Sequence, residues 1–134
     1  IKDPFKVIQN AHQHLQSQGQ LIIVLNHPCF RIPRQSSWGV DPEKHLQFRR
    51  VDRYFSALEI PILTHPSQKE LSSKTFSYHY PLSSYSKWLQ EAGFVMESIE
   101  EWCSDKKSVG KTARMENRSR QEFPLFLAFS ARKA

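Results

Sequence analysis

The spacing of hydrophobic residues near the N-terminus predicts a helix followed by a strand. Apolar residues recur every three or four positions from Pro4 to Leu15, which is the period of an amphipathic helix. Asp3 before Pro4 is a favoured helix cap followed by a favoured first residue. After the turn at Gly19, residues 21–25 (LIIVL) form an apolar run that is too short for a helix and rich in β-branched residues. Such a run is typical of a strand buried on both faces, as in parallel sheets.

The middle of the chain has a weaker pattern. Residues 26–39 (NHPCFRIPRQSSWG) have no period and predict an irregular segment, after which Asp41 could cap a short helix. Apolar and charged residues mix over residues 48–55, which favours a strand over a short helix. Residues 67–73 are typical of a polar turn, and residues 74–80 (KTFSYHY) alternate as a second strand would. The two strands would then form an antiparallel excursion.

Clear periodicity returns in the C-terminal half. The pattern predicts a helix over 81–92, a strand over 94–102, a short helix near 112–120 within the polar tract 104–121, and a strand buried on both faces over 123–129. Gly93 stands where a helix usually ends, and Pro124 stands at the start of its strand, where a missing N–H is tolerated.

The order of these elements indicates an α/β fold. Helix, strand, excursion, helix, strand, loop and strand is the rhythm of a sheet with helices on its faces. No linker or repeat divides the 134 residues, which predicts a single domain. Three strands are strongly hydrophobic, and a doubly wound sheet usually has more. The chain therefore has the pattern of one part of such a sheet.

Composition narrows the class of protein without naming a function. Hydrophobic residues are 39% and charged residues 24%, which is typical of a globular chain, and no apolar run approaches the roughly 20 residues of a membrane span. Two distant cysteines form neither a metal spacing nor a disulfide framework, so we expect a reduced, cytoplasmic setting. The net charge of +6 permits binding of nucleic acid or an acidic ligand and requires neither.

Three segments resemble the C-terminal half of class I S-adenosylmethionine-dependent methyltransferases. Residues 5–28 (FKVIQNAHQHLQSQGQLIIVLNHP) resemble the helix, glycine turn and fifth strand of that family, with Gly19 as the second glycine of its L-x-x-G-G pattern and Gln18 in place of the first. Residues 78–102 (YHYPLSSYSKWLQEAGFVMESIEEW) resemble its H-x-P-L-S-x-Y run, E-A-G-F turn and sixth strand. Residues 124–133 (PLFLAFSARK) resemble its seventh strand, which is antiparallel and inserts between strands five and six.

The resemblance implies a partial Rossmann-like methyltransferase sheet with flanking helices, a β-rich excursion or lid over residues 30–80, and S-adenosylmethionine as the cofactor. The family binds this cofactor through a glycine-rich turn and an acidic residue. The chain has four glycines, and no two of them lie within fifteen residues, so this turn is absent. We therefore expect the C-terminal portion of a larger enzyme, inactive alone, with neither cofactor-binding residues nor a metal site.

Candidate site residues follow from the expected sheet. Ligands of open α/β sheets lie beyond the carboxyl ends of the strands, so residues 26–31 would face the cleft. Transfer of a methyl group to a hydroxyl or amine needs a proton acceptor, for which His27 is the candidate, and the alternative is a histidine that holds the loop by hydrogen bonds. His79 could contact the acceptor from a lid, or simply pack on an edge strand. The expected acceptor-binding residues are Asn26, Arg31, Trp38, Tyr78, His79 and Tyr80. The remaining histidines lack metal-ligand spacing and are expected at the surface or core edge: His12, His14, His45 and His65.

Two further expectations concern partners. Arginines and aromatic residues interleave over residues 30–54, as they do in nucleic-acid surfaces and anionic-substrate pockets. A small-molecule acceptor is the main hypothesis, and a non-catalytic basic module that binds RNA or protein is the alternative. In the resembled family the fifth strand pairs with a fourth strand that is not recognisable here. Residues 21–25 would then form an exposed apolar edge, which favours a homodimer or a domain-swapped assembly.

Overall fold

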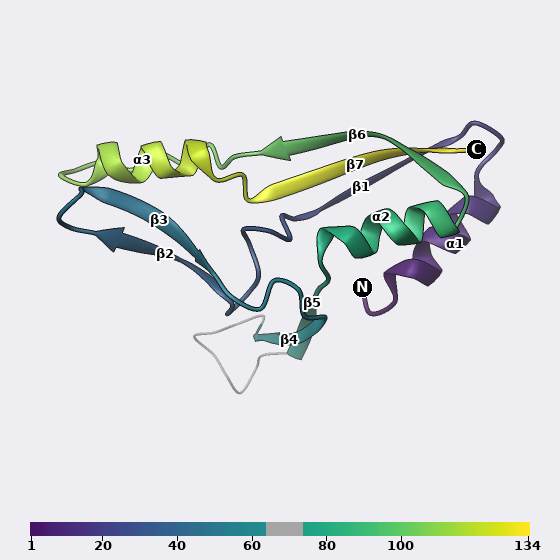
Figure 1. Ribbon diagram of the computed structural model, residues 1–134, viewed down its shortest axis with the longest axis horizontal. Coiled ribbons are helices and arrows are strands. Elements are labelled where there is room, and N and C mark those ends of the chain that lie inside the picture. Colours follow the sequence, from purple (N-terminus) through teal and green to yellow (C-terminus); the bar gives the residue numbers. More distant parts are fainter. Residues whose placement is uncertain (64–73) are drawn as a thin grey trace.

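The computed structural model describes residues 1–63 and 74–134, so the turn expected over 67–73 and the environment of His65 lie outside the described residues. The chain has a mixed α/β structure in which the strands pair antiparallel (Figure 1). The elements in order are α1 (Pro4–His14), β1 (Gln20–Asn26), β2 (Ser36–Asp41), β3 (Leu46–Val51), β4 (Leu58–Leu63), β5 (Lys74–His79), α2 (Leu82–Glu91), β6 (Phe94–Trp102), α3 (Ala113–Glu122) and β7 (Phe126–Lys133).

The main sheet has three strands in the order β1–β7–β6, and β7 runs antiparallel to both neighbours. This is the insertion that the resemblance implied. Ile23 lies opposite Phe129, and Phe129 lies opposite Ile99 on its other side. The strand expected at residues 21–25 is confirmed, but the inference that it is of the parallel type is wrong, because its partner among the described strands is the antiparallel β7.

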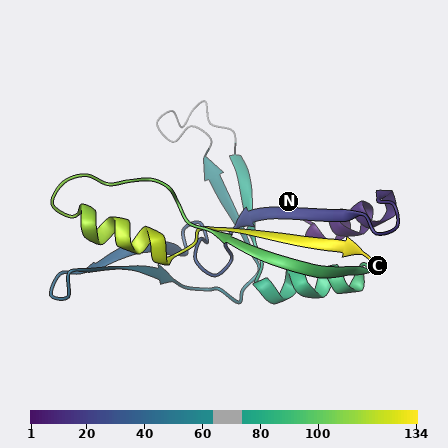
Figure 2. The same cartoon turned by 90° about the horizontal axis from the view of Figure 1, so that it is seen from above.

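Helices α1 and α2 cover one face of this sheet, as the two views together show (Figure 2). The side chain of Asp3 accepts a hydrogen bond from the Lys6 N–H and caps α1. Gly93 ends α2 with a φ of +96°, a conformation that favours glycine. Ile8 of α1 and Leu89 of α2 are buried in a cluster that continues into the sheet. Both helices agree with their predicted bounds to within one residue at each end.

The opposite face of the sheet is apolar and open. Ile22 is 62% exposed and Val24 54%, so the prediction that β1 is buried on both faces is wrong for this chain. Helices α1 and α2 lie on the other side, which leaves these aliphatic residues uncovered. Strand β7 does have both faces buried, with Leu127, Ala128 and Phe129 each at most 5% exposed. It begins at Phe126, three residues later than predicted.

Strands β2 to β5 form two antiparallel pairs outside the main sheet. Strand β2 pairs with β3, and β4 pairs with β5. The expected pairing of residues 48–55 with residues 74–80 is therefore wrong, because each segment pairs with its nearer neighbour along the chain. Asp41 does not start a helix; its carboxylate accepts hydrogen bonds from the Glu43 and Lys44 N–H groups in the turn of the first hairpin. Helix α3 packs beside β3 at the end of the molecule away from α1 and α2 (Figure 1).

Gly39 leaves room for an aromatic ring in the first hairpin. Gly39 lies opposite Phe48, and a Cβ on Gly39 would stand 2.5 Å from the ring of Phe48. The aromatic ring thus lies across the backbone of the neighbouring strand.

No helix among the described residues is long and apolar enough to cross a membrane.

The burial of Tyr85 makes a prediction about alkaline stability. Desolvation raises the pKa of Tyr85 to about 12, with a smaller contribution from the charge of Tyr80. In the unfolded chain the phenol titrates near 10.0, so between pH 10 and about 12 the folded state binds more protons than the unfolded state. The free energy of unfolding should then fall by up to about 1.4 kcal/mol per pH unit. Phenylalanine cannot ionise, so Tyr85→Phe should make this slope shallower.

Urea unfolding at a series of alkaline pH values measures this slope. Wild type and Tyr85→Phe should show parallel stability profiles below pH 10 and diverge above it. Profiles that remain parallel throughout would contradict a buried, late-titrating phenol.

Candidate functional site

A cavity of about 580 Å³ lies along β1, within the size range of small-molecule sites. One wall is β1 itself, and the others come from the start of α1, the segment that follows β1, and the end of β5. The lining is mostly aliphatic and aromatic. Its polar members among the described residues are Asn26, Arg31, Ser77, Tyr78, His79, Tyr80 and Tyr85.

The structure brings together five of the six expected acceptor-binding residues. Asn26 and Arg31 follow β1, and Tyr78, His79 and Tyr80 stand at the end of β5, about fifty positions further along the chain. Trp38 does not line this cavity; its ring lies 5.8 Å from that of Phe123. The aliphatic walls from α1 and β1 were not predicted as site residues, because an apolar stripe in sequence does not distinguish a core from a cavity wall.

His79 is buried, with 5% of its surface exposed, and its ring is fixed by the backbone. Its Nε2 lies 2.7 Å from the carbonyl oxygen of Tyr54. A carbonyl can only accept, so Nε2 carries the proton, and in the neutral ring Nδ1 keeps its lone pair. Burial lowers the pKa of His79 from 6.5, and the hydrogen bond to Tyr54 partly offsets that change. His79 is therefore a neutral histidine in a fixed orientation at the cavity wall.

His27 has a different environment. It is 3% exposed and does not line the cavity. Its Nδ1 accepts a hydrogen bond from the Cys29 N–H, so the neutral ring carries its proton on Nε2, which lies 2.5 Å from a carboxylate oxygen of Glu101. Both ring nitrogens thus have partners. The arrangement matches the local, loop-holding alternative considered for this residue.

Glu101 and Tyr54 are the residues of this region that sequence reasoning missed. Glu101 lies 74 positions from His27 and reaches it only because β6 and β1 flank the same strand. Tyr54 orients His79 through its carbonyl, and its hydroxyl accepts a hydrogen bond from the Leu82 N–H at the start of α2. Neither role has a sequence signal, because one depends on sheet register and the other on a backbone atom.

Two guanidinium groups lie near one end of the cavity. Arg31 lines it, with its guanidinium carbon 5.1 Å from the centre of the Phe126 ring. Arg49 stacks on Trp38 at 4.9 Å, and donates to the Phe30 carbonyl and to the Ser36 hydroxyl. Desolvation lowers the pKa of Arg49, and the positive charges of Arg31 and Arg50 lower it further. The local field is thus positive.

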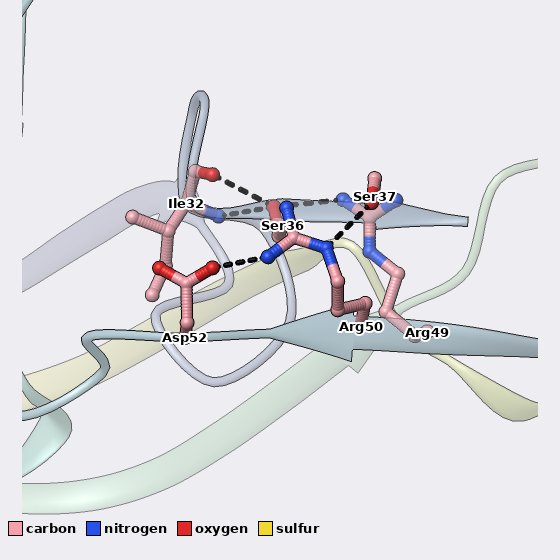
Figure 3. A network of polar contacts seen from close by, with 6 residues as sticks. All are labelled: Ile32, Ser36, Ser37, Arg49, Arg50 and Asp52. Atoms are coloured by element: carbon pink, nitrogen blue, oxygen red, sulfur yellow. Dashed lines mark hydrogen bonds and ion pairs between the residues drawn. The ribbon is translucent and has the colours of Figure 1, made fainter. Parts of the chain in front are cut away.

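Figure 3 shows how the first hairpin uses its arginines. Ser36 exchanges hydrogen bonds with the backbone of Ile32, at 2.8 and 2.7 Å, and Arg49 donates to the same hydroxyl. Arg50 donates to Ser37 and pairs with Asp52. These contacts engage both arginines within the protein, which does not favour their use as an RNA-binding surface. In the part of the chain that the structure describes, no three His, Cys, Asp or Glu side chains gather as metal ligands.

This network predicts unequal costs for two neighbouring arginines. Arg49→Ala removes hydrogen bonds from a charged donor and leaves a partly buried carbonyl without its partner, so unfolding should cost about 1.5–3 kcal/mol less than in wild type. Arg50 forms an exposed ion pair with Asp52, so Arg50→Ala should lower the free energy of unfolding by about 1 kcal/mol or less. Urea denaturation of both variants checks this, and equal losses would show that Arg49 does not anchor the hairpin.

Comparison with known proteins places the fold. The chain is similar to the crystal structure of an S-adenosylmethionine-dependent methyltransferase from Mesorhizobium loti, with a TM-score of 0.68 and 23% identity over 98% of this chain. It is also similar to a Listeria monocytogenes structure assigned to the same class, with a TM-score of 0.68 and 26% identity over the whole chain. The chain spans 56% of the length of each. No family profile and no curated protein sequence matches it. The mixed α/β fold is thus shared with S-adenosylmethionine-dependent methyltransferases.

Proposed function

We propose that this chain is the acceptor side of an S-adenosylmethionine-dependent methyltransferase that acts on a small molecule. The observation that carries the proposal is the group of polar side chains beyond the carboxyl end of β1, where Asn26 and Arg31 share a cavity with the end of β5, in a chain whose full length aligns with part of a methyltransferase structure. Residues 30–80 supply Arg31 and the β5 wall of this cavity, which is what an acceptor-binding excursion would do. The matched structures are longer than this chain, so we propose that cofactor binding requires further polypeptide and that the chain alone does not turn over.

The cavity residues do not fit the cofactor itself. S-adenosylmethionine carries a positive sulfonium and a ribose diol, which proteins bind with carboxylates and close backbone approach. The described lining of the cavity has neither an acidic residue nor a glycine, and its charged side chain is Arg31. A cation repels a sulfonium. The cavity is therefore proposed as the acceptor site alone.

His79 is our candidate for the residue that accepts the proton of the acceptor. Its Nε2–H is held by the Tyr54 carbonyl, which leaves Nδ1 to bind a hydroxyl or amine proton. A base oriented by a third group is the usual arrangement of general base catalysis. His27, whose two nitrogens are engaged, is proposed instead to position the Asn26–Arg31 segment. Asn26, Tyr78 and Tyr80 would contact the body of the acceptor.

Methyl transfer by the full-length gene product that contains this chain tests the proposal. Transfer from labelled S-adenosylmethionine to a panel of small molecules should be detectable. His79→Ala should lower kcat by about a hundredfold or more, with cofactor affinity unchanged. Because the pKa of His79 is lowered from 6.5, the acidic fall of the wild-type kcat/KM should lie below that pH and should vanish in the variant.

His14→Ala is the matched control, because His14 is exposed on α1 and contacts its own helix. It should leave transfer unchanged. A gene product that neither binds S-adenosylmethionine nor transfers a methyl group to any small molecule would overturn the proposed function. Equal kcat values for wild type and His79→Ala would be compatible with a methyltransferase but would rule out His79 as the residue that accepts the proton.

We further propose that the isolated chain forms a homodimer by pairing of β1. Both β1 and β6 are edges of the described sheet, but β6 carries Glu97, Glu100 and Glu101, which discourage pairing, whereas β1 is aliphatic over residues 21–25. Light scattering should give twice the mass of one chain. Val24→Lys should yield the monomer, and Val95→Lys, an equally exposed change on β6, should not. A monomeric wild type would contradict this pairing.

A further inference from the structure

We propose that the segment between β6 and α3 docks the protein on a lipid surface with anionic headgroups, and that Val109 enters this surface. The docking surface, called the basic tip below, consists of one valine and three exposed lysines: Val109, Lys106, Lys107 and Lys111. This binding is separate from methyl transfer and goes beyond the proposed function.

The basic tip lies away from the open edge of β1. It belongs to the segment that leaves β6, and β7 separates β6 from β1 in the sheet. In both views this segment runs out to the end of the molecule opposite α1 and turns there into α3 (Figure 1 and Figure 2). A strand that pairs with β1 adds to the opposite edge of the sheet, so it does not cover the basic tip.

Side-chain hydrogen bonds attach this segment to α3. The Asn117 side chain accepts a hydrogen bond from the Ser108 N–H at 2.8 Å and donates one to the Ser108 carbonyl at 3.3 Å. Arg120 donates to the Ser108 hydroxyl at 2.6 Å. The residue directly before Val109 is thus held at its backbone and at its side chain. A docking surface that is ordered before binding loses less conformational entropy when it binds.

The charge of the basic tip is not cancelled within the protein. Residues 103–122 hold six basic and three acidic residues, so half of the net charge of +6 lies in this stretch. Among the described residues, no Asp or Glu lies within ion-pair distance of its lysines. Arg114 and Arg118 follow on one exposed face of α3, four residues apart. The field at this end is therefore positive, and it attracts anionic headgroups.

Val109 favours a lipid surface over nucleic acid as the partner. Its side chain is 92% exposed, the largest fraction among the large apolar residues that the structure describes. It stands between Lys107 and Lys111, next to Gly110, whose φ of +102° favours glycine. An aliphatic side chain among cations gains free energy when it leaves water for the headgroup region. Residues 103–122 contain no aromatic residue on which an RNA base could stack.

Co-sedimentation of the full-length gene product with vesicles tests the charge contribution. Vesicles of equal parts phosphatidylcholine and phosphatidylglycerol should bind the protein at least about tenfold more tightly than phosphatidylcholine alone, and added salt should weaken this binding. The Lys106→Gln/Lys107→Gln variant should bind about tenfold or more weakly, because each cation near an anionic surface contributes roughly a factor of five. Lys2→Gln/Lys6→Gln removes the same charge from exposed positions near the N-terminus and is the matched control. It should change binding by about twofold or less.

Two substitutions of Val109 test insertion separately from charge. Val109→Ser should weaken binding to the anionic vesicles by about threefold or more, because the aliphatic side chain is replaced by a polar one. Val109→Leu keeps the apolar character and should bind at least as tightly as wild type. The side chain is exposed in the protein, so thermal unfolding of both variants should match that of wild type.

Three results would overturn the lipid surface. They are no binding to the anionic vesicles, unchanged binding in Val109→Ser, and a loss in Lys2→Gln/Lys6→Gln as large as that in Lys106→Gln/Lys107→Gln. Binding of single-stranded RNA that depends on Lys106 and Lys107, without binding to vesicles, would also overturn it and would assign the basic tip to nucleic acid. Vesicle binding involves no turnover, so these outcomes do not depend on whether the protein transfers a methyl group.

Discussion

The rest of the structure depends on the position of β7 between β1 and β6. This strand supplies the antiparallel partner of both neighbours, and its central residues are buried on both faces. Helices α1 and α2 have a surface to pack on only because β7 brings β1 and β6 together. Hydrogen bonds join residues almost a whole chain length apart, as when the Lys133 N–H donates to the Gly19 carbonyl. The three-stranded sheet cannot form without residues 126–133.

The same constraint shapes the site. Where β1 ends, the chain turns sharply at His27, whose N–H donates to the Leu125 carbonyl just before β7 and whose ring reaches Glu101 of β6. The segment after β1 is thus attached to both neighbouring strands, and Arg31 leaves this turn toward the cavity. The opposite wall is less embedded, because β5 belongs to a two-stranded hairpin outside the main sheet. One wall is thus hydrogen-bonded to the main sheet, and the other is linked to the start of α2 through Tyr54, which contacts both His79 and Leu82.

Much of the main sheet could be predicted from sequence, because periodicity and glycine signals are local. The bounds of α1, α2 and β6 were close to those observed, and the resemblance gave the place of β7. The hairpins could not be predicted in the same way. Strand β4 contains Pro61, which argues against a strand, and β2 has one strongly apolar side chain at Val40 besides Trp38, so neither has a clear alternation. Without β2 and β4 as visible strands, the sequence pattern paired the segments of β3 and β5 with each other. Residue types identified two segments that line the cavity, residues 26–31 and 78–80, whereas the hydrogen-bond partners of His27 and His79 arise from register and backbone geometry.

The irregularity in β6 has a consequence for how this strand tolerates change in length. The pairing with β7 shifts between Met96 and Ser98, so Glu97 is an extra residue, and its carboxylate binds Arg132. The extra residue places Glu101, rather than Glu100, opposite Leu127. From this position the Glu101 carboxylate contacts Nε2 of His27. Loss of Glu97 would remove the bulge without moving its neighbours, because Met96 and Ser98 already lie opposite the consecutive residues Ala131 and Ser130. Glu101 would keep its place opposite Leu127, and the cost of the deletion would be the ion pair between Glu97 and Arg132.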